Sequence, residues 1–406
     1  MRVLFLTAHL PFPPISGGRR REFELISRLS KKCEIHLCSV TKTWAIDNTY
    51  VNNMLSYCST VNLFKTVPTD VPQDMLYSFQ MKRHLSPAAR SHISHELAKH
   101  NYDIVHVEGY YLMQLLPSRL QVPIILVEHN IEYLLTLQRF MLSKSCQEKS
   151  RYWQEYVYTI KWERIFWRRA KICVTLTVED KIAMKRLEPD INIKLIPDGK
   201  DHLKDNCAPK RQTDILNSQI SRAPGSRILF VGNFAYEPNI DAALYFSNQI
   251  FPLVLQAVPD AKLFIVGNEP PPQILSLRSN KQIVVTGYVE SVIPFYRMAD
   301  VVVCPLRIGG GVKVKVLEAL HAGKAIVSTP IGAQGLSSNT YQSLAVASDV
   351  THFAQSVVRL LQDPEERLKL ERNALIYAKN LPSWDHAAQA FVKSYKETIS
   401  CTRKNN

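Results

Sequence analysis

The stretch that decides the fold is residues 300–336, DVVVCPLRIGGGVKVKVLEALHAGKAIVSTPIGAQGL. Its first apolar run predicts a strand over Val301–Cys304, and the spacing of the next apolar residues predicts a helix over Val314–His321. A second apolar run predicts another strand over Ala325–Ser328. Strands that are apolar on both faces and separated by helices form parallel sheets, so the stretch predicts an α/β layered domain.

A glycine triplet, residues 309–311, lies between the first strand and the helix. Bare backbone N–H groups at a helix N-terminus attract anions, and Arg307, Lys313 and Lys315 bracket that loop with positive charge. Glu318 lies inside the helix, where a carboxylate can accept hydrogen bonds from ribose hydroxyls. The alternative is a tight turn with solvated lysines, but only 14 glycines occur in 406 residues, which favours a ligand site. The candidate binding residues here are Gly309, Gly310, Gly311 and Glu318.

The same alternation of short apolar runs and amphipathic segments continues on both sides. Further strands are predicted over residues 3–7, 34–40, 103–107, 124–128, 172–177, 227–231, 262–266 and 283–286, and helices over 22–29, from 240 and over 384–399. Residues 201–226 are polar, as a linker is. We therefore predict two tandem Rossmann-like domains, 1–200 and 227–380, joined by linker 201–226 and followed by a C-terminal helix in 381–406. Ligands would bind in a cleft between the domains.

Composition limits the class of protein. Lys and Arg number 50 against 36 Asp and Glu, a formal charge of +14, which predicts either an anionic partner or only good solubility. No nucleic-acid motif accompanies the charge, so we expect no nucleic-acid partner. Eight cysteines without a CxxC pair predict reduced thiols in the cytoplasm and no zinc site. No apolar run approaches the roughly 20 residues that span a bilayer, and the N-terminal apolar run is typical of a buried strand, not a signal peptide.

A basic aromatic segment, residues 151–171, reads RYWQEYVYTIKWERIFWRRAK. Helical spacing puts Trp153, Tyr156, Ile160 and Trp167 roughly on one side. The favoured interpretation is a core-facing helix with basic solvent edges. The alternative is an interfacial helix, which would give weak association with an anionic membrane at its inner face.

The stretch 300–336 resembles the retaining glycosyltransferases of the GT-B fold that are known as family 4, or glycosyl transferases group 1. Members carry two glutamates separated by seven residues on the loop and helix described above. Glu318 with Ala319-Leu320 matches the second glutamate, whereas Gly310 occupies the place of the first. The sequence is similar in this respect to a subgroup with an R-x-G-G-G loop, so we interpret Gly310 as variation and not as loss of activity.

The resemblance continues in the first half of the chain. HLPFPPISGGRRREFELISRLSKK is similar to the family's opening, in which Gly17 and Gly18 would let the donor diphosphate approach bare backbone. In LVEHNIEYLL, His129 follows a predicted strand, where the family places a histidine against the donor sugar. Asn130 and Glu132 are weaker candidates. LIPDGKD, residues 195–201, resembles a structural hinge.

The second half matches the family's donor-binding domain. ILFVGNF places Gly232 and Asn233 where many members continue with an arginine and a lysine for the diphosphate. Because no lysine follows them nearby, Arg307 and Lys315 are predicted to supply that charge. The backbone at Tyr288 and Val289 would read the nucleobase, and the segment from Trp384 is similar to a helix that crosses back to the first domain.

The resemblance implies a glycosyltransferase that moves a sugar from a nucleotide-diphosphate sugar to a polysaccharide or lipid-linked glycan precursor with retention of configuration. The residues predicted to act in the reaction are His129, Arg307 and Lys315. No DxD motif follows a strand, so we predict that the enzyme needs neither a metal nor a cofactor beyond its donor. Two alternatives stay open. One is a non-catalytic partner subunit, for which Gly310 is the best argument, and the other is a nucleotide-sugar epimerase.

Overall fold

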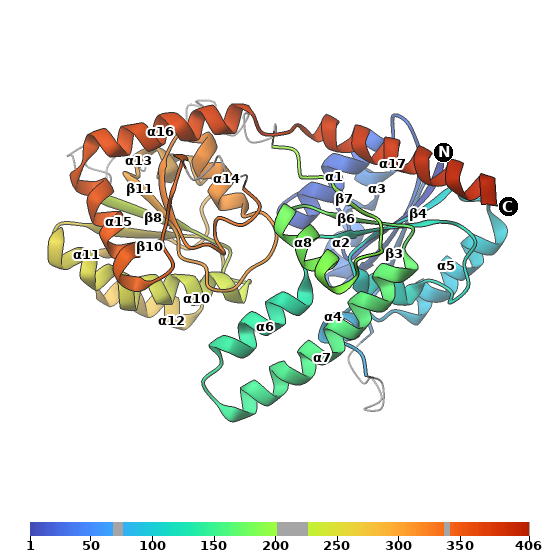
Figure 1. The fold of residues 1–406 in the computed structure, drawn as a ribbon, viewed down its shortest axis with the longest axis horizontal. Coiled ribbons are helices and arrows are strands. Elements are labelled where there is room, and N and C mark those ends of the chain that lie inside the picture. The colour runs from blue at the N-terminus through green and yellow to red at the C-terminus, as the bar shows by residue number, and fades with distance from the viewer. Residues whose placement is uncertain (68–75, 201–225, 337–341, 406) are drawn as a thin grey trace. The chain divides into compact units, whose positions relative to one another are not determined.

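A computed structural model describes residues 1–67, 76–200, 226–336 and 342–405. The chain forms two compact units: unit 1 contains Met1–Gly199 with Pro382–Asn406, and unit 2 contains Lys200–Leu381 (Figure 1). Each unit holds one sheet whose strands all pair in parallel, so the prediction of two parallel α/β domains is confirmed. The predicted linker 201–226 lies, apart from Ser226, outside the described residues.

The sheet of unit 1 has the strand order β3-β2-β1-β4-β5-β6-β7. Its strands are β1 Arg2–Thr7, β2 Glu34–Thr41, β3 Thr60–Lys65, β4 Ile104–Glu108, β5 Ile124–Glu128, β6 Ile172–Thr175 and β7 Ile193–Leu195. The order reverses between β1 and β4, and such a switch point is where open α/β sheets place ligands. The two outer strands, β3 and β7, were not among the predicted strands.

Helices cover both faces of this sheet. The helical segments of unit 1 are α1 Gly17–Leu29, α2 Trp44–Asp47, η1 Asn48–Tyr50, α3 Val51–Leu55, α4 Phe79–Arg83, α5 Pro87–Lys99, η2 Tyr110–Leu115, α6 Glu132–Leu142, α7 Cys146–Arg169, α8 Val178–Leu187 and α17 Trp384–Asn405. One core contains Leu25 of α1 with Trp384 and Phe391 of α17, and the other contains Ile93 of α5 with Trp167 of α7. None of the helices in the described part of the chain combines the length and apolar character needed to cross a bilayer.

The start of α1 differs from the sequence-based expectation. The glycine pair was expected in a loop and the helix from residue 22, but α1 begins at Gly17. Ser16 is its N-cap and its side-chain oxygen accepts from the Arg19 amide, so the cap extends the helix over the glycines. A Cβ at Gly18 would lie 3.3 Å from Cε1 of His9, so the missing side chain makes room for that imidazole.

Helices α6 and α7 form a hairpin that extends away from the sheet of unit 1 (Figure 1). The half of α7 nearer the sheet buries Thr159, Glu163, Phe166 and Trp167, as the core-facing interpretation predicts. Trp153, in the outer half, is 51% exposed. The core contacts of the segment therefore begin at Tyr156, whereas Trp153 before it is largely exposed.

The sheet of unit 2 has the order β10-β9-β8-β11-β12-β13, with its switch point between β8 and β11. Its strands are β8 Arg227–Val231, β9 Lys262–Val266, β10 Ile283–Val285, β11 Val301–Cys304, β12 Ala325–Ser328 and β13 Ala345–Val346. Its helical segments are α10 Glu237–Tyr245, η3 Phe246–Ile250, α11 Phe251–Ala257, α12 Pro272–Leu275, η4 Ser276–Ser279, α13 Ile293–Met298, α14 Val314–His321, α15 Val350–Gln362 and α16 Pro364–Lys379. The apolar strands and helix faces form one continuous core.

Candidate functional site

The switch point of unit 2 brings two predicted segments together. Gly232 and Asn233 follow β8, and Lys315 reaches the same place from α14. The Lys315 ammonium donates to Asn239 Oδ1 at 2.6 Å, and a Cβ at Gly232 would lie 3.2 Å from its Nζ. Asn239 in turn donates from Nδ2 to the Asn233 carbonyl at 2.7 Å. The positive charge that the sequence lacks directly after β8 is therefore supplied from another element.

The Lys315 side chain is half-buried, and its Nζ lies 4.5 Å from the centre of the Phe230 ring. Burial lowers its pKa to about 8, although Cys304 and Glu318 act in the opposite direction. A desolvated ammonium of this kind interacts strongly with an anion because little water competes for it. This makes Lys315 the best placed cation for a phosphate group at this switch point.

Glu318 lies one helical turn after Lys315, on α14. The Tyr296 hydroxyl, from α13, lies 3.0 Å from Glu318 Oε2 and 3.1 Å from the Lys315 carbonyl oxygen. It thereby ties the carboxylate to the first turn of α14. The ribose-binding prediction for Glu318 is compatible with this geometry, since a carboxylate can accept several hydrogen bonds.

The glycine triplet is organised around Lys313. The Lys313 ammonium donates to the carbonyl oxygens of Gly310, at 2.9 Å, and Gly311, at 2.8 Å. Gly311 has φ +59°, a left-handed conformation that favours glycine, and a Cβ at Gly309 would lie 3.0 Å from Lys313 Cε. Lys313, which the sequence analysis placed beside the loop, is therefore buried within it and fixes the loop's shape.

Arg307 is engaged in an ion pair that the sequence did not reveal. Its Nε donates to Asp241 Oδ2 at 3.0 Å, its Nη2 bonds Asp241 Oδ1, and its guanidinium lies 4.4 Å from the Tyr245 ring centre. Both partners belong to α10. The Asp241 carboxylate offsets much of the charge that Arg307 was predicted to offer to the donor.

The predicted base-reading residues follow β10. Tyr288 is 74% exposed, and Val289 packs against the core of unit 2. Gly287, before them, has φ +80°, so the turn that presents Tyr288 depends on glycine.

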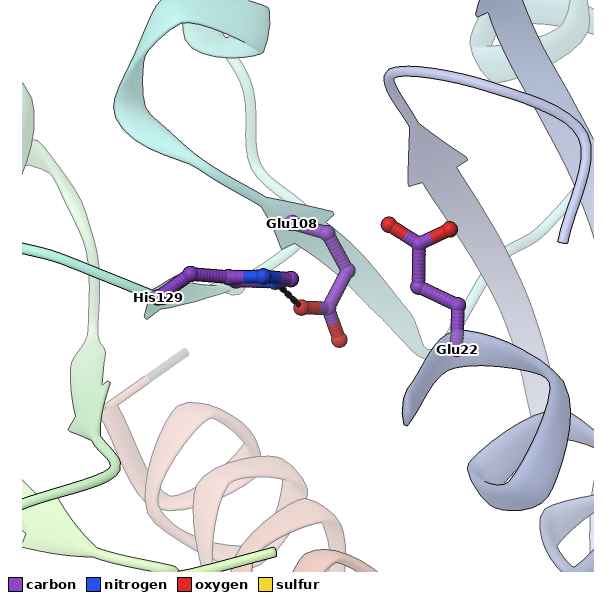
Figure 2. Close-up of side chains that lie close together, drawn as sticks. All are labelled: Glu22, Glu108 and His129. Atoms are coloured by element: carbon purple, nitrogen blue, oxygen red, sulfur yellow. Dashed lines mark hydrogen bonds and ion pairs between the residues drawn. The ribbon is translucent and has the colours of Figure 1, made fainter. Parts of the chain in front are cut away.

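The switch point of unit 1 contains His129. Its Nε2 bonds Oε2 of Glu108, the last residue of β4, and Figure 2 shows this pair beside Glu22 of α1. Glu22 Oε2 lies 2.8 Å from His9 Nε2, and Nε of the buried Arg21 lies 3.6 Å from Glu108 Oε2. The side chains of His9 and His129 thus each face a buried carboxylate.

These contacts set the protonation of the pair. Burial alone would raise the pKa of the Glu108 carboxyl, but Arg21 and His129 beside it hold that pKa well below its usual range. Burial opposes the charged form of His129, but Glu108 outweighs it and raises the imidazole pKa. The Glu108 carboxylate therefore favours the charged form of the His129 imidazole.

Ligand atoms of Glu22, Glu108 and His129 lie within 4.8 Å of one another, a spacing that could hold a metal ion. However, the two carboxylates already face the cationic Arg21 and the imidazoles of His9, His106 and His129. A divalent cation would have to displace these partners and lie near a guanidinium. We therefore interpret the group as a set of ion pairs.

Several site residues were missed from the sequence. Glu108 could have been found by the same feature as His129, namely a titratable residue at the carboxyl end of an apolar strand. Such residues lie at the edge of a parallel sheet where ligands bind. Arg21, in the basic run after Gly17 and Gly18, is buried and paired with Asp198 and Glu108. Asn239 and Tyr296 carried no signal, since their role depends on contacts across unit 2.

Two doubly wound parallel units, each with polar groups gathered at its switch point, define the GT-B class of fold. Residues 15–202 match the family model described as Glycosyltransferase Family 4, and residues 225–363 match the model described as Glycosyl transferases group 1. The chain therefore carries the two domains of a GT-B glycosyltransferase.

Solved structures with the same fold include three proteins at low identity. Sucrose-phosphate synthase from Thermosynechococcus elongatus is 15% identical, with a TM-score of 0.71 over 99% of this chain and 100% of its own. Anabaena HepE in complex with UDP and glucose is 13% identical, with a TM-score of 0.66 over 98% and 100%. WaaG, involved in lipopolysaccharide biosynthesis, is 14% identical, with a TM-score of 0.63 over 96% and 98%. At these identities the likeness shows the fold.

A curated relative shares part of the sequence. An uncharacterized 44.6 kDa protein in the cps region of Klebsiella pneumoniae is 27% identical over 178 residues. The match covers 42% of this chain and 45% of the length of that protein.

Proposed function

We propose that the protein transfers a sugar from a nucleotide-diphosphate sugar to a polysaccharide or lipid-linked glycan precursor, with retention of configuration. The observation that carries the proposal is the half-buried Lys315 ammonium, which lies beside the bare backbone of Gly232 and one helical turn before Glu318. The glycosyltransferase domains support the reaction class. A fold neighbour solved with UDP and glucose supports the donor class, and a relative from a cps region supports polysaccharide synthesis.

The donor would be held by unit 2. Lys315 contacts the diphosphate, and the glycine triplet supplies backbone beside it. Glu318 accepts hydrogen bonds from the ribose, and the backbone of Tyr288 and Val289 meets the base. Arg307 adds less than the sequence predicted, because Asp241 already binds its guanidinium.

The chemistry follows from these groups. Departure of the nucleotide builds negative charge on its β-phosphate, and a fixed ammonium stabilises that charge without the reorganisation that water would need. Lys315 thus takes the place that a divalent metal has in metal-dependent transferases, and we propose metal-independent transfer. We also propose that His129, in unit 1, acts on the donor sugar. Attack would occur on the face that the leaving phosphate vacates.

Nucleotide binding tests this proposal directly. We expect UDP, GDP or ADP to raise the Tm of the full chain, and a panel of nucleotide sugars to identify one that is hydrolysed slowly without an acceptor. Lys315→Met should abolish the shift. Lys324→Met is the matched control, because Lys324 is another partly buried lysine of unit 2 whose ammonium donates to carbonyls of Arg297 and Ala299.

The outcomes separate the alternatives. If the chain binds no nucleotide and shows no turnover, the proposed transferase is overturned and a non-catalytic partner subunit is supported. Conversion of one nucleotide sugar into another without an acceptor would identify an epimerase. Transfer with inverted product configuration would refute retention alone.

We also propose weak association with an anionic membrane at its cytoplasmic face, through the outer half of the α6–α7 hairpin. Met141 and Trp153 are 73% and 51% exposed there, and the basic residues Lys144, Lys149 and Arg151 are exposed around them. Exposed apolar side chains among basic residues are typical of surfaces that lie in the headgroup region.

Co-sedimentation with vesicles tests the surface. Vesicles containing phosphatidylglycerol should retain the protein more than pure phosphatidylcholine vesicles do, and Met141→Asp with Trp153→Asp should remove the difference. Ile376→Asp is the control, since Ile376 is 60% exposed on α16 of unit 2. Equal retention of the wild type, the Met141→Asp/Trp153→Asp variant and the Ile376→Asp control would refute the assignment.

A further inference from the structure

Glu108 holds a histidine with each of its carboxylate oxygens. Oε2 is bonded to His129, and Oε1 lies 2.8 Å from Nε2 of His106. Glu108 and His106 are both fully buried, two residues apart on β4, while the His129 side chain is 25% exposed. The carboxylate therefore joins a buried histidine to the histidine at the edge of the sheet.

The next contact extends to the C-terminal helix. His106 Nδ1 lies 2.6 Å from the hydroxyl of Tyr395, a fully buried residue of α17. The His106 ring also stacks on Phe5, with ring centres 4.0 Å apart. These contacts fix both the plane of the imidazole and the position of its two nitrogens.

The chemistry of the partners assigns the proton on His106. Burial raises the pKa of Tyr395 well above its usual range, so its hydroxyl stays protonated and donates to Nδ1. Burial also lowers the pKa of His106, which keeps its imidazole neutral. With Nδ1 as acceptor, the proton lies on Nε2 and is donated to Glu108 Oε1. Tyr395 then donates to His106, and His106 and His129 each donate to one oxygen of the Glu108 carboxylate.

The titratable side chains around His129 come from several elements. Glu108 lies on β4, Arg21 and Glu22 lie on α1, His9 follows β1, and Glu132 begins α6. Glu108 bonds the imidazole directly, whereas Arg21 opposes its charge and is itself bonded to Asp198. Glu108 is therefore the group whose removal changes His129 most.

We propose that Glu108, His106 and Tyr395 are positioning residues that hold the His129 imidazolium in one orientation for sugar transfer. The proposal rests on the role of His129 in the proposed function. Tyr395 lies 289 positions from His106 in sequence. The proposal gives it an influence on turnover that acts through the side chains of His106 and Glu108. None of the three needs to touch the donor.

Titration of His129 tests the first link and does not depend on turnover. In the full chain with isotope-labelled histidine, assigned by comparison with His129→Gln, the His129 midpoint should lie above the ordinary value of about 6.5. In Glu108→Gln it should fall by a pH unit or more, because the carboxylate that favours the charged ring is gone. An unchanged midpoint in a folded Glu108→Gln chain would overturn the proposal.

Tyr395→Phe tests the far end of the chain and removes one oxygen atom. We expect kcat to fall about tenfold, the effect of losing one hydrogen bond, with the donor KM within twofold of the wild-type value. The matched control is Tyr102→Phe, another buried tyrosine of unit 1, whose hydroxyl donates to Glu96 Oε2 at 2.9 Å. Should Tyr395→Phe and Tyr102→Phe have the same kcat, the relay to Tyr395 is refuted.

The two readouts separate this proposal from the proposed function. If Glu108→Gln does not fold, the His129 midpoint is measured in Tyr395→Phe, where it should move downward by a smaller amount. A wild-type chain without any transfer refutes the proposed function, and the His129 midpoints then still decide whether Glu108 controls that side chain. If transfer is intact but the midpoint of neither variant differs from wild type, only the positioning chain is wrong.

Discussion

Lys315→Met is the substitution that bears most directly on the donor site. Methionine keeps a long, mainly apolar side chain against Phe230 and removes only the ammonium. A hydrogen bond to a charged group contributes about 1.5–3 kcal/mol, and each 1.4 kcal/mol is a factor of ten in Kd. We therefore expect the Kd for UDP, or for whichever nucleoside diphosphate binds, to rise roughly 10- to 100-fold.

The pH dependence of nucleotide binding tests the assignment of Lys315 in a second, independent way. Burial lowers the Lys315 pKa to about 8, so the site loses its positive charge as the pH rises through that value. Nucleotide affinity of the wild-type protein should fall between pH 7 and pH 9, while that of Lys315→Met should change little. Isothermal titration calorimetry at the two pH values measures both.

Stability of the unliganded protein should change in the opposite direction. The folded pKa of Lys315, about 8, lies below the unfolded value of about 10.4, so the unfolded state binds more protons between them. The Lys315 contribution therefore raises the free energy of unfolding as the pH rises from 8 towards 10. Lys315→Met should lack this rise. A variant whose Kd for nucleotide lies within twofold of wild type at pH 7 would refute the assignment of Lys315 to the diphosphate.

Other substitutions give distinct outcomes. Glu318→Gln should weaken binding of a nucleoside diphosphate about tenfold but leave binding of inorganic pyrophosphate unchanged, because only the ribose contact is lost; equal losses would contradict this. Arg307→Met should change the Kd by less than threefold, as Asp241 already binds the guanidinium, and a larger loss would restore Arg307 to the donor site. Glu163→Ala should lower the free energy of unfolding, measured by urea titration, by about 2–4 kcal/mol. The Glu163 carboxyl group accepts hydrogen bonds from the backbone amides of Glu132 at 2.7 Å and Tyr133 at 3.0 Å, and its removal leaves both amides unpaired. Wild-type stability in that variant would show that water replaces the carboxylate.

The central strands could be predicted because both of their faces are apolar. β5, β8, β9, β11 and β12 match the predicted bounds, since each is a short apolar run between polar segments. Of the edge strands, β10 was predicted, whereas β3, β7 and β13 were not. β3 is only partly buried along its length, and β7 has three residues, so neither produces a continuous apolar run. Their strand conformation depends on pairing with β2 and β6.

Some features of the candidate site could likewise be predicted from local sequence, and others could not. Local pattern was enough to place Lys315 and Glu318 on a helix after a glycine loop, and to place His129 at the end of a strand. It could not show that Lys313 lies within the loop, since a lysine in a polar segment normally extends into water. Nor could it show that Ser16 caps α1 and extends it over Gly17 and Gly18.

The sequence by itself determined the alternation of strands and helices, the two α/β domains and the glycine loop at residues 309–311. These depend on hydrophobic periodicity and glycine content, which act over a few neighbouring residues. The tertiary structure alone decided which charges are available. Asp241 binds Arg307 across 66 positions, Asn239 bonds Lys315 across 76, and Tyr395 reaches His106 across 289. Electrostatic and hydrogen-bond partners depend on distances of a few ångströms in space, and separation along the chain does not predict them.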